Sequence, residues 1–299
     1  MEWKNKKIAI TGVTGQLGTA ICRMLGPIAV PLPRQVADLN QPSAVATTIE
    51  QVRPDTVINC AGWTAVDDAE AAPAECHAVN ALAVGEIAKA CNNIHATLVQ
   101  VSTDYVFGAD LNRSTPFSET DLPGPLNVYG ASNLAGEEAA IQAKKHLIIR
   151  TCGLYAANDL GPVRGRNFAD TMLCIAAEKQ HVRVVSDQHC TPSFVPHVAD
   201  GILDLLRHQA TGLFHVVNNG SATWHGFAYE LFQAAGIDIT TQGIPADEYP
   251  TAAPRPRFSV LSTNKFETTV GQPLPNWRTG IAEYVKAMKP YLAQRERTA

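Results

Sequence analysis

The feature that most restricts the fold is a glycine-rich turn between an apolar strand and a helix near the start of the chain. Ile8–Ile10 is a strand candidate, and residues 11–18 that follow it read TGVTGQLG. Gly12 would permit the tight turn, Gly15 the close approach of a pyrophosphate, and Gly18 close packing of the helix on the sheet. The free N–H groups and positive end of the helix would then face the phosphates. The residues assigned to a dinucleotide by this turn are Gly12, Gly15, Gln16, Leu17 and Gly18.

Short apolar runs and helical patterns alternate through the first 150 residues. This order predicts a parallel sheet with right-handed crossovers, covered by helices on both faces. After Ile8–Ile10, the expected strands are 28–30, 56–59, 98–102 and 146–149. The expected helices are 16–25, 42–52, 73–91 and 134–143.

The pattern becomes irregular after Arg150. Residues 182–185 and 213–217 look like further strands, with a helix over 197–207 between them. Residues 245–257 contain four prolines and are expected to form a loop. We therefore predict an α/β fold, a doubly wound parallel sheet (Rossmann) with a smaller discontinuous C-terminal substrate lobe. The dinucleotide-binding domain is expected to cover 1–155 and about 181–217, and the lobe about 156–180 and 218–299.

Composition excludes several other classes of protein. The 299 residues are 45% hydrophobic, with 24 basic against 28 acidic side chains, which is typical of a folded protein without a nucleic-acid-binding surface. The sequence has no apolar run of membrane-spanning length and no signal-peptide pattern, so a cytoplasmic protein is expected. Its seven cysteines form no Cys-x-x-Cys pair and its histidines are scattered, which predicts neither disulfides nor a metal site.

The end of the second strand bears on which dinucleotide binds. An acidic residue there would bind the ribose 2′-hydroxyl of NAD, whereas this chain has Pro31-Leu32-Pro33-Arg34. Arg34 could pair with a 2′-phosphate, which favours NADPH over NADH, or it could be a solvated surface arginine. Asp38 and Leu39 are placed beside the adenine ring.

Two further motifs point to chemistry at the carboxyl edge of the sheet, where doubly wound folds bind ligands. STDYVF (102–107) ends the fourth strand, and VYGASNLAGE (128–137) opens a helix. With TGVTGQLG (11–18), INCAGWTAVDDAE (58–70), DQHCTPS (187–193) and RPRFSVLSTNKF (255–266), they form an ordered series along nearly the whole chain. The chain resembles the extended short-chain dehydrogenase/reductases, and among them the dTDP-4-dehydrorhamnose reductase family.

The resemblance implies reduction of a 4-keto nucleotide sugar, dTDP-4-dehydro-L-rhamnose, by hydride from NADPH. Tyr129 would donate the proton to the resulting alkoxide, and Thr103 would hold the carbonyl oxygen. It also implies cofactor contacts at Gly62, Trp63, Thr64, Tyr129 and Asn133, and substrate contacts at Ser102, Thr103, Asp104, Tyr105 and Arg255. Arg255 could clamp a diphosphate or be a solvated loop residue. A homodimer and bound magnesium are family-level expectations, although no carboxylate cluster in the sequence has ligand spacing.

Two residues depart from the family pattern. The family has Tyr-x-x-x-Lys, whereas this chain has Tyr129-x-x-x-Asn133, so the residue on the same helix face as the tyrosine carries no charge. We include Asn133 with the catalytic group and expect a weakened activity. The family also has a tryptophan where this chain has Gly153. The pocket is then wider, or another residue fills it.

Three functions remain open on this sequence. The first is an active NADPH-dependent reductase, which Thr103 and Tyr129 favour. The second is a dinucleotide-binding regulatory subunit that has lost turnover, which Asn133 and Gly153 favour. An epimerase or dehydratase ranks third, because those usually keep the lysine and, for dehydratases, carry extra acidic residues after the threonine.

Overall fold

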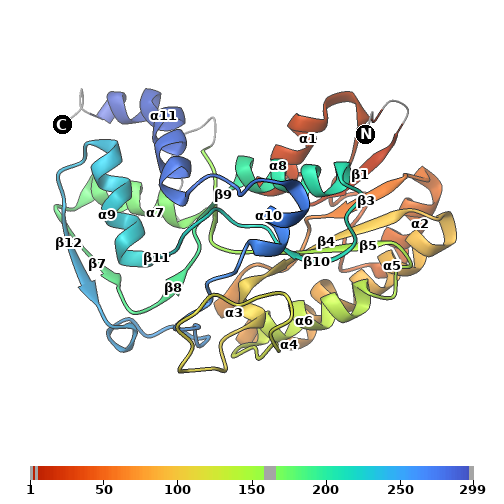
Figure 1. Ribbon diagram of the computed structural model, residues 1–299, viewed down its shortest axis with the longest axis horizontal. Coiled ribbons are helices and arrows are strands. Elements are labelled where there is room, and N and C mark those ends of the chain that lie inside the picture. The colour runs from red at the N-terminus through yellow and green to blue at the C-terminus, as the bar shows by residue number, and fades with distance from the viewer. Residues whose placement is uncertain (1–2, 4–5, 158–165, 296–299) are drawn as a thin grey trace.

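A six-stranded, all-parallel sheet forms the centre of the first domain (Figure 1). The computed structural model describes residue 3 and residues 6–157 and 166–295. The strand order is β10-β5-β4-β3-β1-β2. The strands are β1 (Ile8–Thr11), β2 (Ala29–Leu32), β3 (Thr56–Asn59), β4 (Thr97–Thr103), β5 (His146–Thr151) and β10 (Gly212–His215). This confirms the predicted doubly wound fold class.

Side chains alternate along these strands between two apolar cores, one on each face of the sheet. Ile8 and Ile10 of β1 belong to the core beneath α1 (Gln16–Leu25) and α8 (Val195–Arg207). Ala9, between them, belongs to the core beneath α2 (Pro42–Val52) and α5 (Ala83–Ile94). Because both faces are covered, the strands are predominantly apolar, which is why they could be found from the sequence.

Two of the expected helices differ from those observed. The segment expected as one helix over 73–91 is α4 (Pro73–His77), a π-helical turn (Ala78–Leu82) and α5. The helix expected to begin at residue 134 is α6 (Val128–Ala140), which begins six residues earlier. Its start is fixed by Asn127, whose side chain accepts a hydrogen bond from the Gly130 amide at 2.7 Å.

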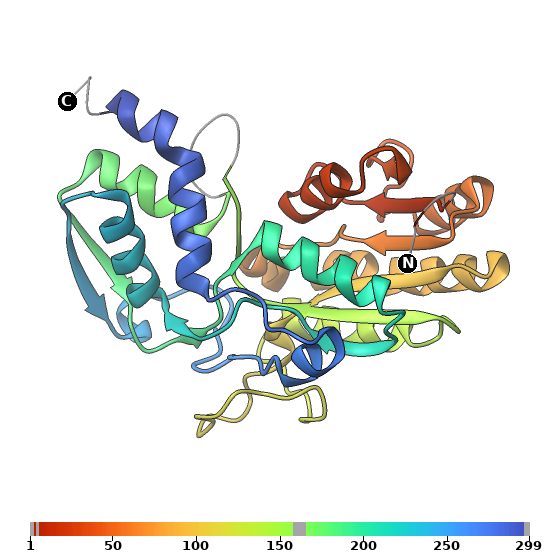
Figure 2. The ribbon, with the colours of Figure 1, turned by 45° about the horizontal axis from the view of Figure 1, so that its top comes forward.

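The second lobe lies beside the carboxyl edge of the sheet, at the left of Figure 1 and Figure 2. Its core is built around Tyr155, Phe227, Trp277 and Tyr284. Its helices are α7 (Phe168–Glu178), α9 (Trp224–Ala235) and α11 (Trp277–Arg295). The paired strands are β7 (His181–Val185) with β12 (Thr240–Ile244), β8 (His189–Cys190) with β11 (Ala222–Thr223), and β6 (Leu154–Tyr155) with β9 (Ser193–Phe194).

Residues 181–217 contribute strands to both parts of the molecule. The expectation places residues 181–217 together in the dinucleotide-binding domain, and within that stretch β10 does join the six-stranded sheet. β7, however, pairs in parallel with β12 of the lobe. Its partner lies some sixty residues further along the chain, so the local pattern could not reveal the pairing. The remaining helices are α3 (Val66–Ala71) near the site and α10 (Asn264–Val270), which packs on α8 and β10.

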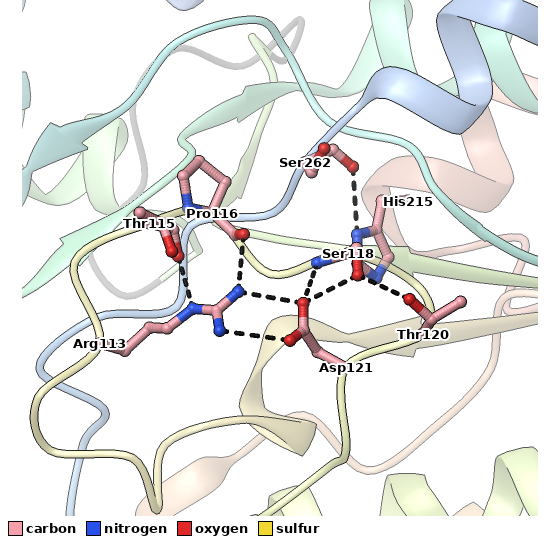
Figure 3. Close-up of polar contacts among 8 residues, drawn as sticks. All are labelled: Arg113, Thr115, Pro116, Ser118, Thr120, Asp121, His215 and Ser262. Carbon is pink, nitrogen blue, oxygen red and sulfur yellow. Dashed lines mark hydrogen bonds and ion pairs between the residues drawn. The ribbon is translucent and has the colours of Figure 1, made fainter.

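A segment that we call the strap, residues 251–262, returns from the lobe to the first domain. The Phe117 amide donates to the Val260 carbonyl at 2.8 Å, and the Ser262 amide donates to the Phe117 carbonyl at 2.7 Å. Figure 3 shows the loop that receives it, which is braced internally by Arg113 and Asp121. The end of the strap meets His215 through the Ser262 carbonyl, 3.2 Å from Nδ1 (Figure 3).

Candidate functional site

The glycine turn leaves no room for a side chain at Gly12 or Gly18. Gly12 has φ of 66°, and a Cβ there would lie 2.6 Å from the backbone of Cys60 and Ala61. A Cβ on Gly18 would lie 2.4 Å from the Gly12 carbonyl oxygen. Helix α1 begins at Gln16 without a side-chain cap. The N–H groups of its first turn are therefore not bonded by a capping side chain and can donate to a ligand. This cradle fits a phosphate group bound by backbone N–H donors.

A pocket of about 470 Å³ opens from this turn. It gathers eight of the residues predicted to contact the cofactor: Gly12, Gly15, Arg34, Asp38, Leu39, Gly62, Trp63 and Thr64. The side chains of Gln16 and Leu17 point elsewhere. Gln16 accepts a hydrogen bond from Asn167 at 3.0 Å, and Leu17 is buried in the core. Their backbone amides, in the first turn of α1, remain available to a ligand of the turn.

Arg34 stands at the outer end of the pocket. Its side chain is 74% exposed and its Nε lies 3.3 Å from Oδ2 of Asp38. Hydrogen bonds from Asn40, followed by those from Arg34, lower the pKa of Asp38. Arg34 is therefore a cation held near the pocket with most of its guanidinium open to solvent, a position that fits a 2′-phosphate.

Side chains also fix the loops that form the pocket. The Thr11 hydroxyl donates to Asn59, and the Asn59 amide donates to Gln100 at 2.8 Å, so a polar row crosses β1, β3 and β4. Asn80, in the π-helical turn, accepts from the Trp63 amide at 2.8 Å. A π-helical turn often marks a functional site. Here it places the Asn80 side chain against the loop of Gly62, Trp63 and Thr64, which is predicted to contact the cofactor.

Tyr129 and Thr103 meet at the carboxyl edge of the sheet, as predicted for the catalytic pair. Thr103 is the last residue of β4, and Tyr129 is the second residue of α6. The start of α6 is also held by Glu70, which accepts from the Val128 amide at 2.8 Å. Burial of the Tyr129 phenol raises its pKa to about 12, although the nearby Thr103 hydroxyl acts to lower it. At neutral pH this phenol is therefore protonated and can donate.

Asn133 lies one turn beyond Tyr129, and its amide donates to the Tyr129 carbonyl at 2.9 Å. The groups that act most strongly on the phenol are Thr103, Asp104, Cys76 and Cys152, none of which is a cation. Within the part of the chain that the structure describes, none of these groups replaces the charge of the family lysine.

The predicted substrate residues occupy different surroundings. Ser102 turns into the interior, where its hydroxyl donates to Glu137 at 2.5 Å. Glu137 forms a buried two-pronged ion pair with Arg150, at 2.8 and 2.7 Å. Tyr105 packs edge-on against Tyr129, with 5.7 Å between ring centroids. The roles of Ser102, Asp104 and Tyr105 toward a substrate stay predictions.

Arg255 is held by Asp67, a residue to which the sequence alone assigns no role. Its guanidinium donates to both Asp67 oxygens, at 3.1 and 2.8 Å, and so ties the strap to the first turn of α3. The arrangement lowers the pKa of Asp67, mainly through the hydrogen bond from Arg255. Asp67 lies in the segment that follows β3, within the motif of residues 58–70, and those were the sequence signals for it.

Gly153, the second departure, lies two residues after the end of β5 and has φ of 52°. The indole of Trp224, at the start of α9, lies against it. The nearest side-chain atom to a Cβ at position 153 belongs to this indole, at 3.4 Å. His189, Cys190 and the rest of the dispersed histidines and cysteines form no group of three metal-ligating side chains among the described residues. All seven cysteines are free thiols.

This dinucleotide cradle, with a Tyr–Thr pair at the same sheet edge, defines a short-chain dehydrogenase/reductase, a class of oxidoreductase. The family model for the RmlD substrate binding domain matches residues 6–289. A dTDP-4-dehydrorhamnose reductase of Shigella flexneri is 39% identical over 292 residues, covering 92% of this chain and 95% of that one. The chain belongs to the dTDP-4-dehydrorhamnose reductase family.

Solved structures and a further relative agree with that assignment. A dTDP-4-dehydrorhamnose reductase of Bacillus anthracis, in complex with NADP, has a TM-score of 0.87 at 32% identity and covers 93% of this chain and 98% of that one. A relative from Bacillus subtilis named as a spore coat polysaccharide biosynthesis protein is 32% identical, covering 94% of this chain and 97% of that one. Among the described residues, no helix has the length and apolar character needed to span a membrane.

Proposed function

We propose that this protein reduces dTDP-4-dehydro-L-rhamnose to dTDP-L-rhamnose with NADPH as the reductant. The observation that carries the proposal is the placement of Tyr129, in the first turn of α6, near Thr103 at the end of β4, at the same sheet edge as a glycine cradle with Arg34 at its outer end. The family assignment and the NADP complex of the Bacillus anthracis relative support it.

The residues of the chain have separate tasks in this reaction. The amides of the Gly12–Gly18 turn and Arg34 would hold the phosphates of the dinucleotide. When bound, the nicotinamide supplies hydride to the C4 carbon of the sugar. Thr103 would position the ketone oxygen, and the protonated Tyr129 would donate its proton to that oxygen. Reduction uses the acid form of the tyrosine, which a pKa of about 12 keeps fully populated at neutral pH.

Asn133 favours a second candidate, a dinucleotide-binding regulatory subunit with little turnover. Its amide is engaged by the Tyr129 carbonyl and brings no charge to the phenol. A phenol with a pKa of about 12 gives up its proton less readily than one near its ordinary value of about 10.

The deciding experiment measures NADPH consumption by the wild type, Tyr129→Phe and Asn133→Lys with dTDP-4-dehydro-L-rhamnose. The reductase proposal expects turnover by the wild type and a loss of roughly 10²–10⁴-fold in Tyr129→Phe. Turnover only in Asn133→Lys, with NADPH bound equally by all three, would establish the regulatory alternative. NADPH binding is followed separately by cofactor fluorescence.

The choice of NADPH has its own test. Arg34→Ala should weaken NADPH binding by roughly tenfold or more, the loss expected for one charge-assisted contact of about 1.5–3 kcal/mol, and leave NADH binding nearly unchanged. Equal losses of NADPH and NADH binding would show that Arg34 does not contact the 2′-phosphate.

A further inference from the structure

Asn167 is a buried asparagine of the second lobe that reaches the phosphate turn of the first domain. It is the N-cap of α7, and its Oδ1 accepts a hydrogen bond from the Asp170 amide at 2.8 Å. Its Nδ2 donates to Oε1 of Gln16 at 3.0 Å and to the Ala156 carbonyl at 3.2 Å. Both polar atoms of this side chain are thus engaged by protein, and both hydrogens of its NH₂ group are used.

The helix cap fixes which way the Asn167 amide faces. Only its oxygen can accept from the Asp170 N–H group, so its NH₂ group must face Gln16. An amide nitrogen donates but does not accept, so Gln16 in turn must present its oxygen to Asn167. The orientation of the Gln16 amide is therefore set by the first turn of a helix in the other lobe.

The NH₂ group of Gln16 is left without a protein partner. Among the residues that the structure describes, none accepts a hydrogen bond from its Nε2. Gln16 is the first residue of α1, and its side chain lies between that helix and the lobe, in a pocket of about 380 Å³. Helical side chains lean toward the N-terminal end of their helix, which here is the end that carries the phosphate cradle. The backbone N–H and the side-chain NH₂ of Gln16 can therefore reach the same diphosphate.

We propose that Asn167 is a positioning residue, which turns the Gln16 amide so that Nε2 donates to the diphosphate of the bound dinucleotide. The inference rests on the proposed function and deepens it, because it gives the lobe a part in holding the cofactor. An NH₂ group that donates to a phosphate oxygen forms a charge-assisted hydrogen bond, whereas an amide oxygen turned toward the same phosphate repels it. Reversal of this one amide should consequently weaken cofactor binding.

Asn167→Asp reverses the Gln16 amide while leaving the helix cap in place. A carboxylate caps a helix as well as an asparagine side chain does, so the start of α7 is kept. The second carboxylate oxygen, however, faces Gln16 as an acceptor, and Gln16 must turn over to donate Nε2 to it. The oxygen of Gln16 then lies on the side of the diphosphate. A bridge that only fastens the lobe would not make NADPH binding depend on this reversal.

Fluorescence titration with NADPH compares the wild type, Asn167→Asp, Gln16→Ala and the double variant. We expect each single variant to weaken NADPH binding by roughly tenfold or more, the loss of one charge-assisted hydrogen bond. Once the Gln16 side chain is removed, Asn167→Asp should change binding by less than about threefold. Losses that multiply in the double variant would overturn the proposal, because direct repulsion by the new charge, or damage to α7, acts without Gln16.

Asn167→Ser asks the same question without an added charge. A serine hydroxyl also caps the helix but gives Gln16 no fixed donor, so the amide can adopt either orientation. NADPH binding should weaken by less than in Asn167→Asp, and again only while Gln16 is present. A loss in Asn167→Ser as large as that in Asn167→Asp would show that the direction of the Gln16 amide does not matter, and the proposal would fail.

A fragment of the cofactor locates the effect. Adenosine 2′-phosphate, which contains no diphosphate, should bind the wild type and all these variants equally in a calorimetric titration. A loss that matches the loss for NADPH would place the damage elsewhere in the cradle and refute the inference. None of these titrations contains the sugar. A wild type that follows the expected pattern but reduces no sugar would refute the proposed function alone, whereas a wild type that turns over while the losses multiply would refute only the role of Asn167.

Discussion

The indole of Trp224 lies 3.4 Å from the point where a Cβ on Gly153 would stand. The Cα of Pro192 lies 3.2 Å from the same point. A side chain at position 153 is thus opposed by a ring from the second lobe and by its own left-handed backbone, since φ is 52°. Gly153 and Trp224 therefore pack against each other where the first domain meets the second lobe, and a larger residue at 153 would compete with the indole for space.

Gly153→Trp should lower the free energy of unfolding, by about 1–3 kcal/mol from overpacking and about 1–2 kcal/mol from the left-handed backbone. In the double variant with Trp224→Ala, only the overpacking is relieved. Urea unfolding of the wild type, both single variants and the double variant gives the coupling energy. Costs that add within about 0.5 kcal/mol would show that the two residues do not compete for space.

Gly12→Ala should abolish dinucleotide binding and destabilise the protein more than a left-handed backbone alone explains. Gly236 is a matched control, because it has the same φ of 66° but a Cβ there would meet no atom within 4 Å. Gly236→Ala should cost about 1–2 kcal/mol, the ordinary cost of that conformation. Equal losses of thermal stability in the two variants would mean that the contacts with Cys60 and Ala61 relax freely.

Asn133→Lys should bring the pKa of Tyr129 down from about 12, because a nearby opposite charge lowers an acid's pKa by about 1–3 units. The absorbance of the phenolate, measured against matched variants with Tyr129→Phe, reports that pKa. Asn133→Gln adds no charge and should leave it in place. A Gln variant that lowers the pKa as much as Lys does would assign the effect to loss of the bond to the Tyr129 carbonyl.

Glu137→Gln should destabilise the protein by about 3–5 kcal/mol, because it leaves the buried Arg150 without its counter-charge. Their side chains are 5% and 3% exposed. The exposed pair of Lys89 and Glu86 is the control, and Glu86→Gln should cost less than about 1 kcal/mol. Chemical denaturation of both variants makes the comparison, and similar losses would show that burial does not strengthen the inner pair.

His215 should make the fold sensitive to acid. Its burial, aided by Arg150, lowers its pKa from 6.5 to about 3. Between those two values the unfolded chain binds a proton that the folded protein does not, so the free energy of unfolding falls as the pH drops below about 6.5. His215→Gln should reduce that fall by up to about 1.4 kcal/mol per pH unit. The exposed His208→Gln should not, and an identical acid response in all three proteins would contradict the assignment.

The strands and turns of the first domain could be predicted because short local sequence patterns specify them. Ile8–Thr11 and Thr56–Asn59 are apolar runs that need burial on both faces, and Gly12 marks the turn that must follow. The start of α6 could not be predicted for the opposite reason. Its first turn has no apolar repeat, and it is held by Asn127 and by Glu70, which lies 58 residues away.

The second lobe and parts of the site depend on contacts that no local pattern encodes. β8 and β11 are two residues long and pair with each other, and β8 also bonds to the strap through His189. Arg255 bonds to Asp67, which is 188 residues away in the sequence, and Ser259 bonds to Asp104, which is 155 residues away. The glycine cradle and the Tyr129–Thr103 pair were predictable by motif, whereas the groups that orient them were not.

The polar row of Thr11, Asn59 and Gln100 occupies one level of three adjacent strands, with Thr11 opposite Asn59 and Asn59 opposite Gln100. A slip of one strand by a single residue would set an apolar side chain against these groups and leave buried amides without partners. The polar row therefore fixes the register of the three strands from which the loops after β1, β3 and β4 begin. Insertions or substitutions in one of those loops can therefore change ligand recognition without altering the register of the strands from which the other two loops begin.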